Sequence, residues 1–332
     1  MKQTTLSAAP SRLPGTDGQP IFGRFAGQTG AIDWRELAPP YARSRLWRRF
    51  HHKRWHYVAL YTEQVFCAVA IVDVGWTNTA FAYAFERHSG RMLAEFSQDG
   101  LPGCTASLPH RPTGVSQFRM LGKQIHINTA DHGVSSLALR CGEFAIDASF
   151  GPAAAPLLLA AGPVADGAVH ATQKSGGMPL QGQLRVGART LALDGGIASF
   201  DYSNGLLARN TAWRWASAHD LAMGFNLQAG YFGAQENALW LDGKLYPLGA
   251  ARFEYDRNDS RAPWQISTDD GLLELSFTPE GERRGDKNLL VAASRYVQPI
   301  GTFSGWVRSA PDQPRRAVQQ LAGVTEDHAS RW

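Results

Sequence analysis

The sequence has little cysteine and no long apolar run. Its three cysteines, Cys67, Cys104 and Cys141, lie far apart in 332 residues, and an odd, widely spaced set argues against a disulfide framework or a zinc knuckle. The longest apolar stretch, APLLLAAGPVA, is short and interrupted by prolines, and the first twenty residues contain no signal-peptide core. We therefore expect a cytoplasmic protein with no transmembrane segment.

The sequence also lacks the short motifs that carry common enzyme chemistries. It contains no G-x-G-x-x-G after a strand, no P-loop, no H-E-x-x-H, no G-x-S-x-G and no C-x-x-C. Nucleotide-dependent, zinc-dependent and serine hydrolase chemistry are therefore disfavoured. We expect no cofactor and no metal ligands.

Charge is low and mostly dispersed. Charged residues are 19% of the chain and the net charge is +4, with one basic cluster at Arg43–Arg54 (RSRLWRRFHHKR). This cluster is either a solvated helix or loop, or a weak contact for an anionic surface such as phosphate or lipid. The basic pattern does not continue and no nucleic-acid motif follows, so we expect no nucleic-acid partner.

Aromatic residues, in contrast, are plentiful at 11%, with ten tryptophans. From Trp55 onward the chain alternates in the strand period, as in TAFAYAF, where Phe81, Tyr83 and Phe85 are separated by alanines. Only residues 31–37 and 41–50 favour helices. Short strands at regular spacing with turns between them predict an all-β fold of sandwiches or barrels.

A Pro-, Gly- and Ala-rich segment, residues 151–167, interrupts the strand pattern. We predict a linker there, between an N-terminal β domain at 1–150 and a C-terminal β domain at 168–332. In the second half, Asp242-Gly243 and Asp270-Gly271 predict hairpin turns, and a third hairpin with a longer loop follows near the C-terminus.

The segment VHATQK carries the first candidate site. As a strand, it places His170, Thr172 and Lys174 on one face. A base or acid, a hydroxyl and a cation together suit proton transfer with charge stabilisation. The alternative is a solvent-facing strand. We predict His170 as the proton-transferring residue, its pKa depressed by the nearby Lys174.

The segment TAWRWAS carries the second candidate site. Trp213 and Trp215 share one face of a strand, and Arg214 takes the other. Either the indoles pack in a core with Arg214 exposed, or Arg214 lies in a polar lumen opposite Glu236, which we predict as its buried partner. We therefore assign Glu236 to the catalytic set with His170 and Lys174.

Further polar residues stand among apolar neighbours. Asn226 and Asn237 either satisfy backbone groups or orient a substrate. We predict a substrate-binding set of Trp213, Arg214, Trp215, Asn226, Asn237 and Thr172. Near the C-terminus, Glu326 and His328 share a strand face as a carboxylate-oriented imidazole does, although a terminal position favours a barrel-closing or surface role.

Several segments together resemble a bacterial family known as domain of unknown function 2804. They include LPGTDGQPIFGRF, KRWHYVAL, HATQKSGGMPLQGQL, TAWRWASA, ENALWLDGKLYPLG, PWQISTDDGLLELSFTP and GVTEDHASRW, and the match runs nearly end to end. More loosely, the tandem β pattern with an early Trp-x-Trp strand is similar to the double-lipocalin group, which contains carotenoid hydratases and tocopherol cyclase. This resemblance implies two calycin-type barrels with a pocket for a hydrophobic small molecule.

Two functions follow from these expectations. One is a cofactor-independent lyase, hydratase, isomerase or cyclase acting on a hydrophobic small molecule by acid–base chemistry. The other is a non-catalytic, lipocalin-like carrier of such a ligand. An enzyme needs several ionisable groups facing its cavity, whereas a carrier needs an apolar lining. The predicted His170, Lys174, Arg214 and Glu236 favour the enzyme.

Overall fold

The computed structural model describes residues 6–131, 133–288 and 292–332. In this part of the chain the helices are a 3-10 turn, η1 (Trp34–Glu36), and α1 (Arg45–His51). The first lies within the predicted segment 31–37 but is only one turn long, and α1 overlaps the predicted segment 41–50 and ends one residue beyond it. The Ser44 side chain caps α1 by accepting a hydrogen bond from the Trp47 backbone N–H at 3.2 Å. No helix of the described residues is long and apolar enough to cross a membrane.

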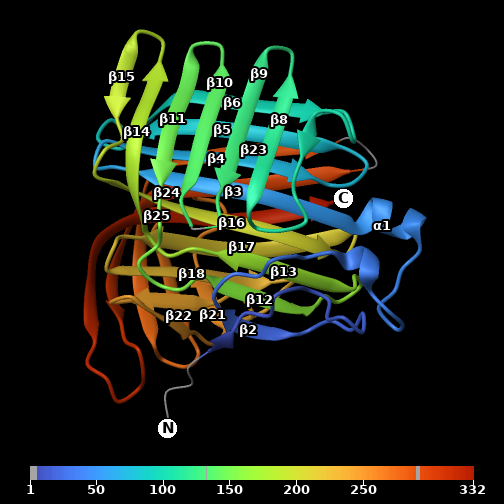
Figure 1. The fold of residues 1–332 in the computed structure, drawn as a ribbon. Coiled ribbons are helices and arrows are strands. Elements are labelled where there is room, and N and C mark those ends of the chain that lie inside the picture. Colours follow the sequence, from blue (N-terminus) through green and yellow to red (C-terminus); the bar gives the residue numbers. More distant parts are fainter. Residues whose placement is uncertain (1–5, 132, 289–291) are drawn as a thin grey trace.

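The first sixteen strands of the described residues belong to one curled sheet (Figure 1). These strands are β1 (Ser7–Ala8), β2 (Gly23–Ala26), β3 (His52–Tyr61), β4 (Val65–Asp73), β5 (Asn78–Glu86), β6 (Arg91–Gly100), β7 (Ala106–Ser107), β8 (Gly114–Met120), β9 (Lys123–Thr129), β10 (Ser135–Cys141), β11 (Phe144–Phe150), β12 (Leu158–Pro163), β13 (Val169–Lys174), β14 (Met178–Val186), β15 (Arg189–Ala192) and β16 (Gly196–Leu206).

The long strand β16 is where this sheet branches. One edge of β16 pairs with β3 along its whole length, while the other edge pairs first with β14 and then with β13. The strands β8–β11 and β14 therefore fold back across β3–β6, as the crossing ribbons in the upper half of Figure 1 show. The first hydrophobic core fills the space between these two layers.

The other nine strands form the second sheet. They are β17 (Asn210–His219), β18 (Met223–Gly230), β19 (Ala238–Leu241), β20 (Lys244–Pro247), β21 (Ala251–Glu254), β22 (Trp264–Thr268), β23 (Leu273–Asn288), β24 (Ala293–Val307) and β25 (Arg316–Arg331). β18 and β21 lie next to each other although they do not pair, so this sheet also curls around its own core. The three predicted hairpins are present as β19–β20, β22–β23 and β24–β25.

The predicted linker at 151–167 contains a strand of the first sheet. β12 pairs with β13 and β2, so this segment is not a free connection. The chain passes from the first sheet to the second between Leu206 and Asn210, because Leu206 is the last residue of β16 and Asn210 the first of β17. The division into independently folding domains at 1–150 and 168–332 stays a prediction.

The outer face of β3–β5 packs against the second sheet. Period-two alternation sends the alanines of β5 into the first core and Phe81, Tyr83 and Phe85 toward the second sheet. There they join a cluster that includes Ile300 and Val324 of the second sheet. The all-β expectation of two tandem curled sheets with few short helices is confirmed, and the aromatic face between the sheets borders the candidate site.

Candidate functional site between the two sheets

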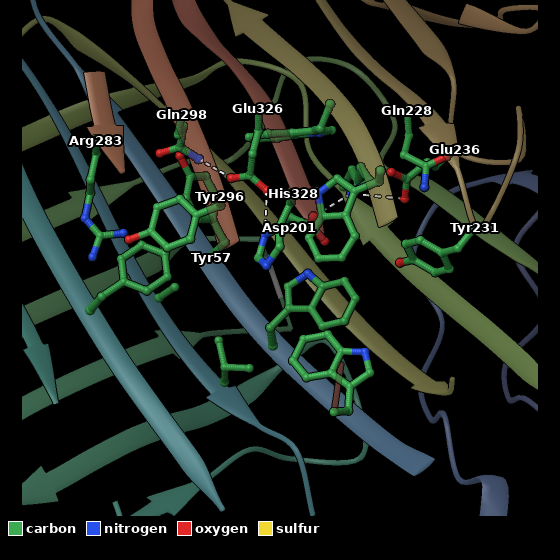
Figure 2. Close-up of a pocket in the computed structure, with 18 residues that line it drawn as sticks. Tyr57, Asp201, Gln228, Tyr231, Glu236, Arg283, Tyr296, Gln298, Glu326 and His328 are labelled. Atoms are coloured by element: carbon green, nitrogen blue, oxygen red, sulfur yellow. Dashed lines mark hydrogen bonds and ion pairs between the residues drawn. The ribbon is translucent and has the colours of Figure 1, made fainter. Parts of the chain in front are cut away.

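A pocket lies between the outer face of the first sheet and the facing side of the second (Figure 2). Its volume is about 140 Å³, near that of an engineered cavity that binds benzene. Its lining combines eight tryptophan, tyrosine and phenylalanine side chains with eight polar or charged ones. The lining residues are Trp55, Tyr57, Ala70, Val72, Phe81, Lys174, Asp201, Trp213, Trp215, Gln228, Tyr231, Glu236, Arg283, Tyr296, Gln298, Glu326, His328 and Trp332.

One wall is a row of residues that lie opposite one another on neighbouring strands of the first sheet. Lys174 pairs in register with Asp201, and Asp201 pairs with Tyr57 on β3. Tyr57 then pairs with Ala70, and Ala70 with Phe81. Residues opposite each other on adjacent strands share a face, so sheet register alone brings these side chains to one wall.

The opposite wall follows the same rule across the second sheet. Trp215 of β17 lies opposite Gln228 on β18 and opposite Glu326 on β25. One step along, Trp213 lies opposite His328. The two tryptophans of TAWRWAS thus face the pocket, and the strand period places Arg214 on the far side of the sheet.

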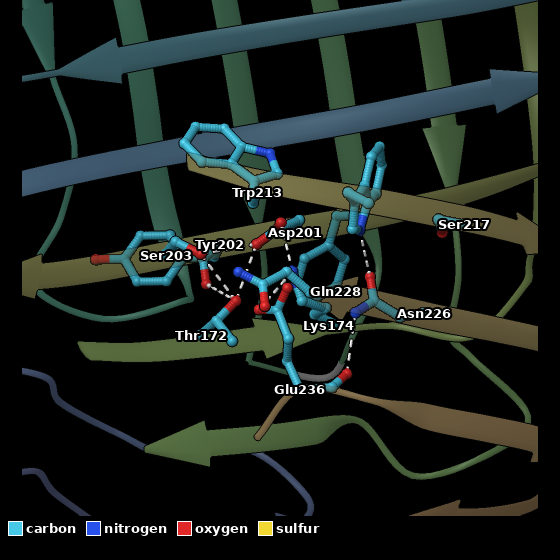
Figure 3. Close-up of polar contacts among 12 residues, drawn as sticks. Thr172, Lys174, Asp201, Tyr202, Ser203, Trp213, Ser217, Asn226, Gln228 and Glu236 are labelled. Carbon is cyan, nitrogen blue, oxygen red and sulfur yellow. Dashed lines mark hydrogen bonds and ion pairs between the residues drawn. The ribbon is translucent and has the colours of Figure 1, made fainter. Parts of the chain in front are cut away.

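A buried charged group lies at one end of the pocket (Figure 3). The Lys174 ammonium donates to Asp201 Oδ2 at 2.5 Å and lies 3.3 Å from Glu236 Oε2. The Asp201 Oδ1 atom accepts from the hydroxyls of Thr172 at 3.0 Å and Ser203 at 2.9 Å. One ammonium is therefore shared by two carboxylates, only one of which is held by hydroxyl groups of its own sheet.

The pKa values of the two carboxyl groups move in opposite directions. Burial alone would raise the pKa of Asp201, but the Lys174 charge and the hydroxyl hydrogen bonds outweigh it, so this pKa is lowered. For Glu236, burial and the Asp201 charge raise the pKa against the opposing effect of Lys174. The same two carboxylates outweigh burial at Lys174 and raise its pKa. Environments that push two carboxyl pKa values apart are a hallmark of acid–base sites.

Gln228 completes this end of the pocket, and we call Lys174, Asp201, Glu236 and Gln228 the Lys174 cluster. Gln228 is 2% exposed, and neither its side-chain oxygen nor its nitrogen has a hydrogen-bond partner among the described residues. Leaving a buried polar group unpaired costs about 1–3 kcal/mol. The Lys174 cluster therefore contains an unsatisfied amide beside a protonatable carboxyl group.

The predicted asparagines support this cluster without lining the pocket. Asn226 accepts from the Trp215 indole N–H at 2.8 Å and donates to the Glu236 main-chain oxygen at 2.9 Å. The Asn237 side-chain oxygen accepts from the Gln228 backbone N–H at 2.6 Å, and its amide donates to the Gly249 carbonyl at 2.8 Å. Both amides thus satisfy backbone groups, one of the two roles that the sequence left open.

A second polar group borders the same pocket, and we call Glu326, His328, Gln298 and Trp213 the Glu326 cluster. Glu326 Oε1 accepts from the Trp213 indole at 2.9 Å and lies 3.1 Å from His328 Nδ1, while Oε2 accepts from Gln298 Nε2 at 2.7 Å. His328 Nε2 lies 2.9 Å from the Ser330 hydroxyl. Both carboxylate oxygens and both imidazole nitrogens therefore already have protein partners.

His170 lies behind the pocket rather than on its lining. It is on the same face of β13 as Thr172 and Lys174, as predicted, but it is fully buried. Its Nε2 atom lies 3.3 Å from the hydroxyl of Tyr231, which does line the pocket. Burial first, and then the Lys174 charge, lower the His170 pKa to about 3. The sequence predicted a lowered His170 pKa with Lys174 as the cause. The direction agrees with the structure, in which burial is the larger cause.

The predicted pair between Arg214 and Glu236 is wrong. Glu236 pairs with Lys174, whereas Arg214 lines a separate hollow with Tyr255 and Asp327 at one end of the second sheet. The reason is strand alternation, because Arg214 points away from the face on which Trp213 and Trp215 meet the pocket. Arg214 is accordingly not among the residues that line the pocket.

Sequence reasoning missed Asp201, Gln228 and Tyr231. A signal for Gln228 was present, because it stands two residues after Asn226 and the strand period gives both the same face. Asp201 had no such signal. Its role depends on the register between β13 and β16, which sets Lys174 opposite Asp201 and which no local pattern encodes.

Two curled sheets with an aromatic pocket between them define a double lipocalin-like barrel, the class that the sequence predicted. The chain belongs to the family described as Domain of unknown function (DUF2804), whose model matches residues 7–332. The resemblance to this family is thus confirmed. No curated protein matches the sequence significantly.

Two solved structures have the same fold. Kievitone hydratase from Nectria haematococca is 11% identical, with a TM-score of 0.50 over 94% of this chain and 98% of that one. A "putative ATTH" from Nitrosomonas europaea is also 11% identical, with a TM-score of 0.53 over 88% of this chain and 98% of that one. At this level of identity the likeness establishes the fold alone.

Proposed function

We propose that this protein is a cofactor-independent enzyme of the lyase, hydratase or isomerase type. Its substrate is a flat, largely apolar small molecule bound between Trp213, Trp215 and the facing wall of the first sheet. The observation that carries the proposal is one buried ammonium, Lys174, shared by two buried carboxyl groups at an aromatic-lined pocket. Asp201 lies 2.5 Å from the ammonium and accepts from two hydroxyl groups, whereas Glu236 lies 3.3 Å away and burial raises its pKa.

Glu236 is the general acid in this proposal. Its carboxyl group donates a proton to a substrate atom, and the carboxylate that forms is stabilised by the Lys174 ammonium 3.3 Å away. In an isomerisation the carboxylate regains a proton from another substrate atom, and in a hydration it regains one from the water that adds. Both cycles restore the acid, so the proton balance closes without an external reagent.

The other predicted site residues support Glu236 in different ways. Thr172 holds Asp201, while Asn226 and Asn237 fix the chain around Glu236 and Gln228. His170 acts through the Tyr231 hydroxyl, which it contacts, rather than on the substrate. We accordingly propose His170 as a positioning residue and leave Arg214 out of the substrate-binding set. The name of one structural neighbour, a hydratase, is compatible with water addition.

The experiment that tests this function compares ligands recovered from the native host. The wild type, Glu236→Gln and Asp327→Asn are purified and their bound small molecules identified by mass spectrometry. Asp327 is the matched control, because it neighbours Glu326 on β25 but its carboxylate accepts from Tyr255 on the far face. We expect only Glu236→Gln to accumulate a substrate that purified wild type converts to an isomer or a hydrate.

The carrier function makes a different prediction for the same experiment. All three proteins would carry one unchanged compound, and incubation with the wild type would not alter its structure. That result would contradict the enzymatic proposal. Because the proposed step uses only protein groups, turnover is also expected to survive dialysis against a metal chelator, and a loss of turnover restored by one added metal would contradict it.

The basic segment Arg43–Arg54 supports a second proposal, a weak contact with an anionic surface. In α1, Leu46 is 70% exposed and Phe50 is 50% exposed, and the helix carries three arginines and no acidic residue. Basic helices with exposed apolar residues adsorb to anionic lipid. Co-sedimentation with phosphatidylglycerol vesicles, but not with neutral ones, is expected and should be lost in Leu46→Ser/Phe50→Ser. A cytoplasmic location likewise stays a prediction.

A further inference from the structure

Two groups that line the pocket, the Tyr57 hydroxyl and the Gln228 side chain, are buried without a hydrogen-bond partner among the described residues, and of these Gln228 leaves both a donor and an acceptor unpaired. Its backbone is fixed by Asn237 on one side and by pairing with Trp215 on the other. Its amide, nevertheless, is buried and without a partner among the described residues, and it lies on the pocket lining (Figures 2 and 3). Native proteins keep few such groups, so each one calls for an explanation.

The neighbouring polar side chains offer Gln228 no partner. Lys174 is engaged by Asp201 and Glu236, and Asn226 bridges the Trp215 indole and the Glu236 main chain. An apolar side chain of the same length would fill this position without any unpaired polar atom. A methionine would therefore serve the fold as well as the Gln228 amide does. The unpaired donor and acceptor of the amide face the cavity.

A primary amide presents an acceptor oxygen and a donor N–H side by side in one plane. The complementary ligand group presents a donor and an acceptor side by side, as a lactam, an enol or a hydroxy-carbonyl group does. The charges at this end of the pocket narrow the class of suitable ligands further. At this end of the pocket the Asp201 carboxylate, together with Glu236, already compensates the positive charge of Lys174, and the pocket arginine, Arg283, pairs with Glu95. A ligand anion beside Gln228 would therefore be desolvated without compensation.

We propose that Gln228 is the specificity-determining residue of the pocket and selects a neutral, flat ligand that carries a hydrogen-bond donor and a hydrogen-bond acceptor side by side on one edge. The indoles of Trp213 and Trp215 bind the planar skeleton, and the Gln228 amide fixes its polar edge beside Glu236. This inference rests on the proposed function for its choice of pocket and adds the chemical class of the substrate.

Binding of unreactive probes tests the inference separately from catalysis. Three bicyclic probes differ only in their polar edge: 2-quinolone carries an adjacent donor and acceptor, quinoline an acceptor alone, and naphthalene neither. Affinities are measured by calorimetry and by quenching of tryptophan fluorescence. We expect the wild type to bind 2-quinolone at least about tenfold more tightly than naphthalene, a difference of about 1.4 kcal/mol, with quinoline between them.

The variant Gln228→Met keeps the length of the side chain and removes its hydrogen bonds. It should bind 2-quinolone and naphthalene equally, with naphthalene bound at least as tightly as by the wild type and the melting temperature unchanged or higher. The matched control is Gln298→Met, a pocket glutamine that donates to Glu326 and accepts from the Tyr83 hydroxyl. This control should lower the melting temperature but keep the preference for 2-quinolone.

Other outcomes overturn the inference. If Gln228→Met keeps the wild-type preference, the amide does not select the ligand. If it lowers the melting temperature as Gln298→Met does, a buried water or a structural partner occupies the amide instead. Binding of none of the probes would contradict the pocket itself and, with it, the proposed function. Failure of the Glu236→Gln experiment alone would leave these binding results intact.

Discussion

The two polar clusters that border the pocket use similar residue types in different ways. In the Glu326 cluster each carboxylate oxygen and each imidazole nitrogen has a protein partner. In the Lys174 cluster one ammonium is shared by two carboxyl groups, and the Gln228 amide has no partner among the described residues. A closed hydrogen-bond network stabilises a wall, whereas an unsatisfied one has capacity left for a ligand. The two clusters therefore differ in how completely their hydrogen bonds are satisfied and not in residue type. We assign the satisfied Glu326 cluster to support of the pocket wall and the unsatisfied Lys174 cluster to catalysis and ligand binding.

The largest expected effect is on turnover and tests directly whether the Lys174 cluster and the Glu326 cluster differ in role. Glu236→Gln removes the proposed acid and should slow the reaction by about 10²–10⁴, the size expected for losing general acid catalysis. Glu326→Gln should slow it far less, because Glu326 is already fully bonded within its wall. Both rates are measured on the compound recovered with Glu236→Gln. Equal losses in the two variants would mean that the clusters do not differ in role.

The next effect concerns stability. Lys174→Met removes the only cation among the side chains of the Lys174 cluster and leaves two buried carboxyl groups uncompensated, so the free energy of unfolding should fall by about 3–5 kcal/mol. Urea denaturation measures it. Arg140→Met is the control, because Arg140 pairs with Asp147 at 2.5 Å but both side chains are nearly half exposed, at 47% and 48%. An exposed pair contributes about 0–1 kcal/mol. Similar losses for the two variants would mean that the Lys174 pair is not buried.

A third experiment compares the stability of the same two variants, Glu326→Gln and Glu236→Gln, and here we expect the larger effect from Glu326→Gln. Glu326→Gln places an amide N–H where the carboxylate accepts from Trp213, Gln298 and His328, so it should cost about 1.5–3 kcal/mol of stability, as expected for hydrogen bonds to a charged group. Glu236→Gln should cost less than about 1 kcal/mol, because burial raises the pKa of Glu236 and so makes its charge less favourable in the folded protein, and glutamine carries no charge. A larger loss from Glu236→Gln would show that Glu236 is a structural carboxylate.

His170 provides a pH test of the region behind the Lys174 cluster. Its folded pKa is about 3, whereas an unfolded histidine has a pKa near about 6.5. Between these values only the unfolded chain binds the proton, so acidification from pH 6.5 should destabilise the protein through this residue by up to about 1.4 kcal/mol per pH unit. His170→Gln should make the decline in stability between pH 6.5 and 4 less steep by that amount. An unchanged pH dependence would mean that His170 is protonated in the folded protein.

The sequence predicted the fold well because strand alternation and turn residues are local. TAFAYAF gave both the inner and outer faces of β5, and Asp242-Gly243 gave the β19–β20 turn. It also placed Lys174 and His170 on one strand face. The segment 151–167 was predicted as a linker because it is rich in prolines and small residues, and no local pattern shows that Leu158–Pro163 pairs with strands on both sides.

The site was only partly predictable because its geometry depends on register between distant strands. Lys174 meets Asp201 through the β13–β16 pairing, and Trp215 meets Glu326 through the β17–β25 pairing. Neither pairing is encoded near the residues that it joins. The same limitation explains why Glu236, correctly selected as a buried carboxylate, was given the wrong cation.

Arg214 yields the smallest expected effect and tests that correction. The predicted pair with Glu236 would have made Arg214→Met cost about 3–5 kcal/mol. In the structure Arg214 is only partly buried, in a hollow that also contains Tyr255 and Asp327, so truncating it should cost about 0–1 kcal/mol, as for an exposed pair. Because its side chain lies on the opposite face of β17 from Trp213 and Trp215, it should also leave the affinity for 2-quinolone unchanged. If calorimetry shows that Arg214→Met binds 2-quinolone more weakly than the wild type, Arg214 contributes to substrate binding. The two faces of β17 would then not differ in function as we propose.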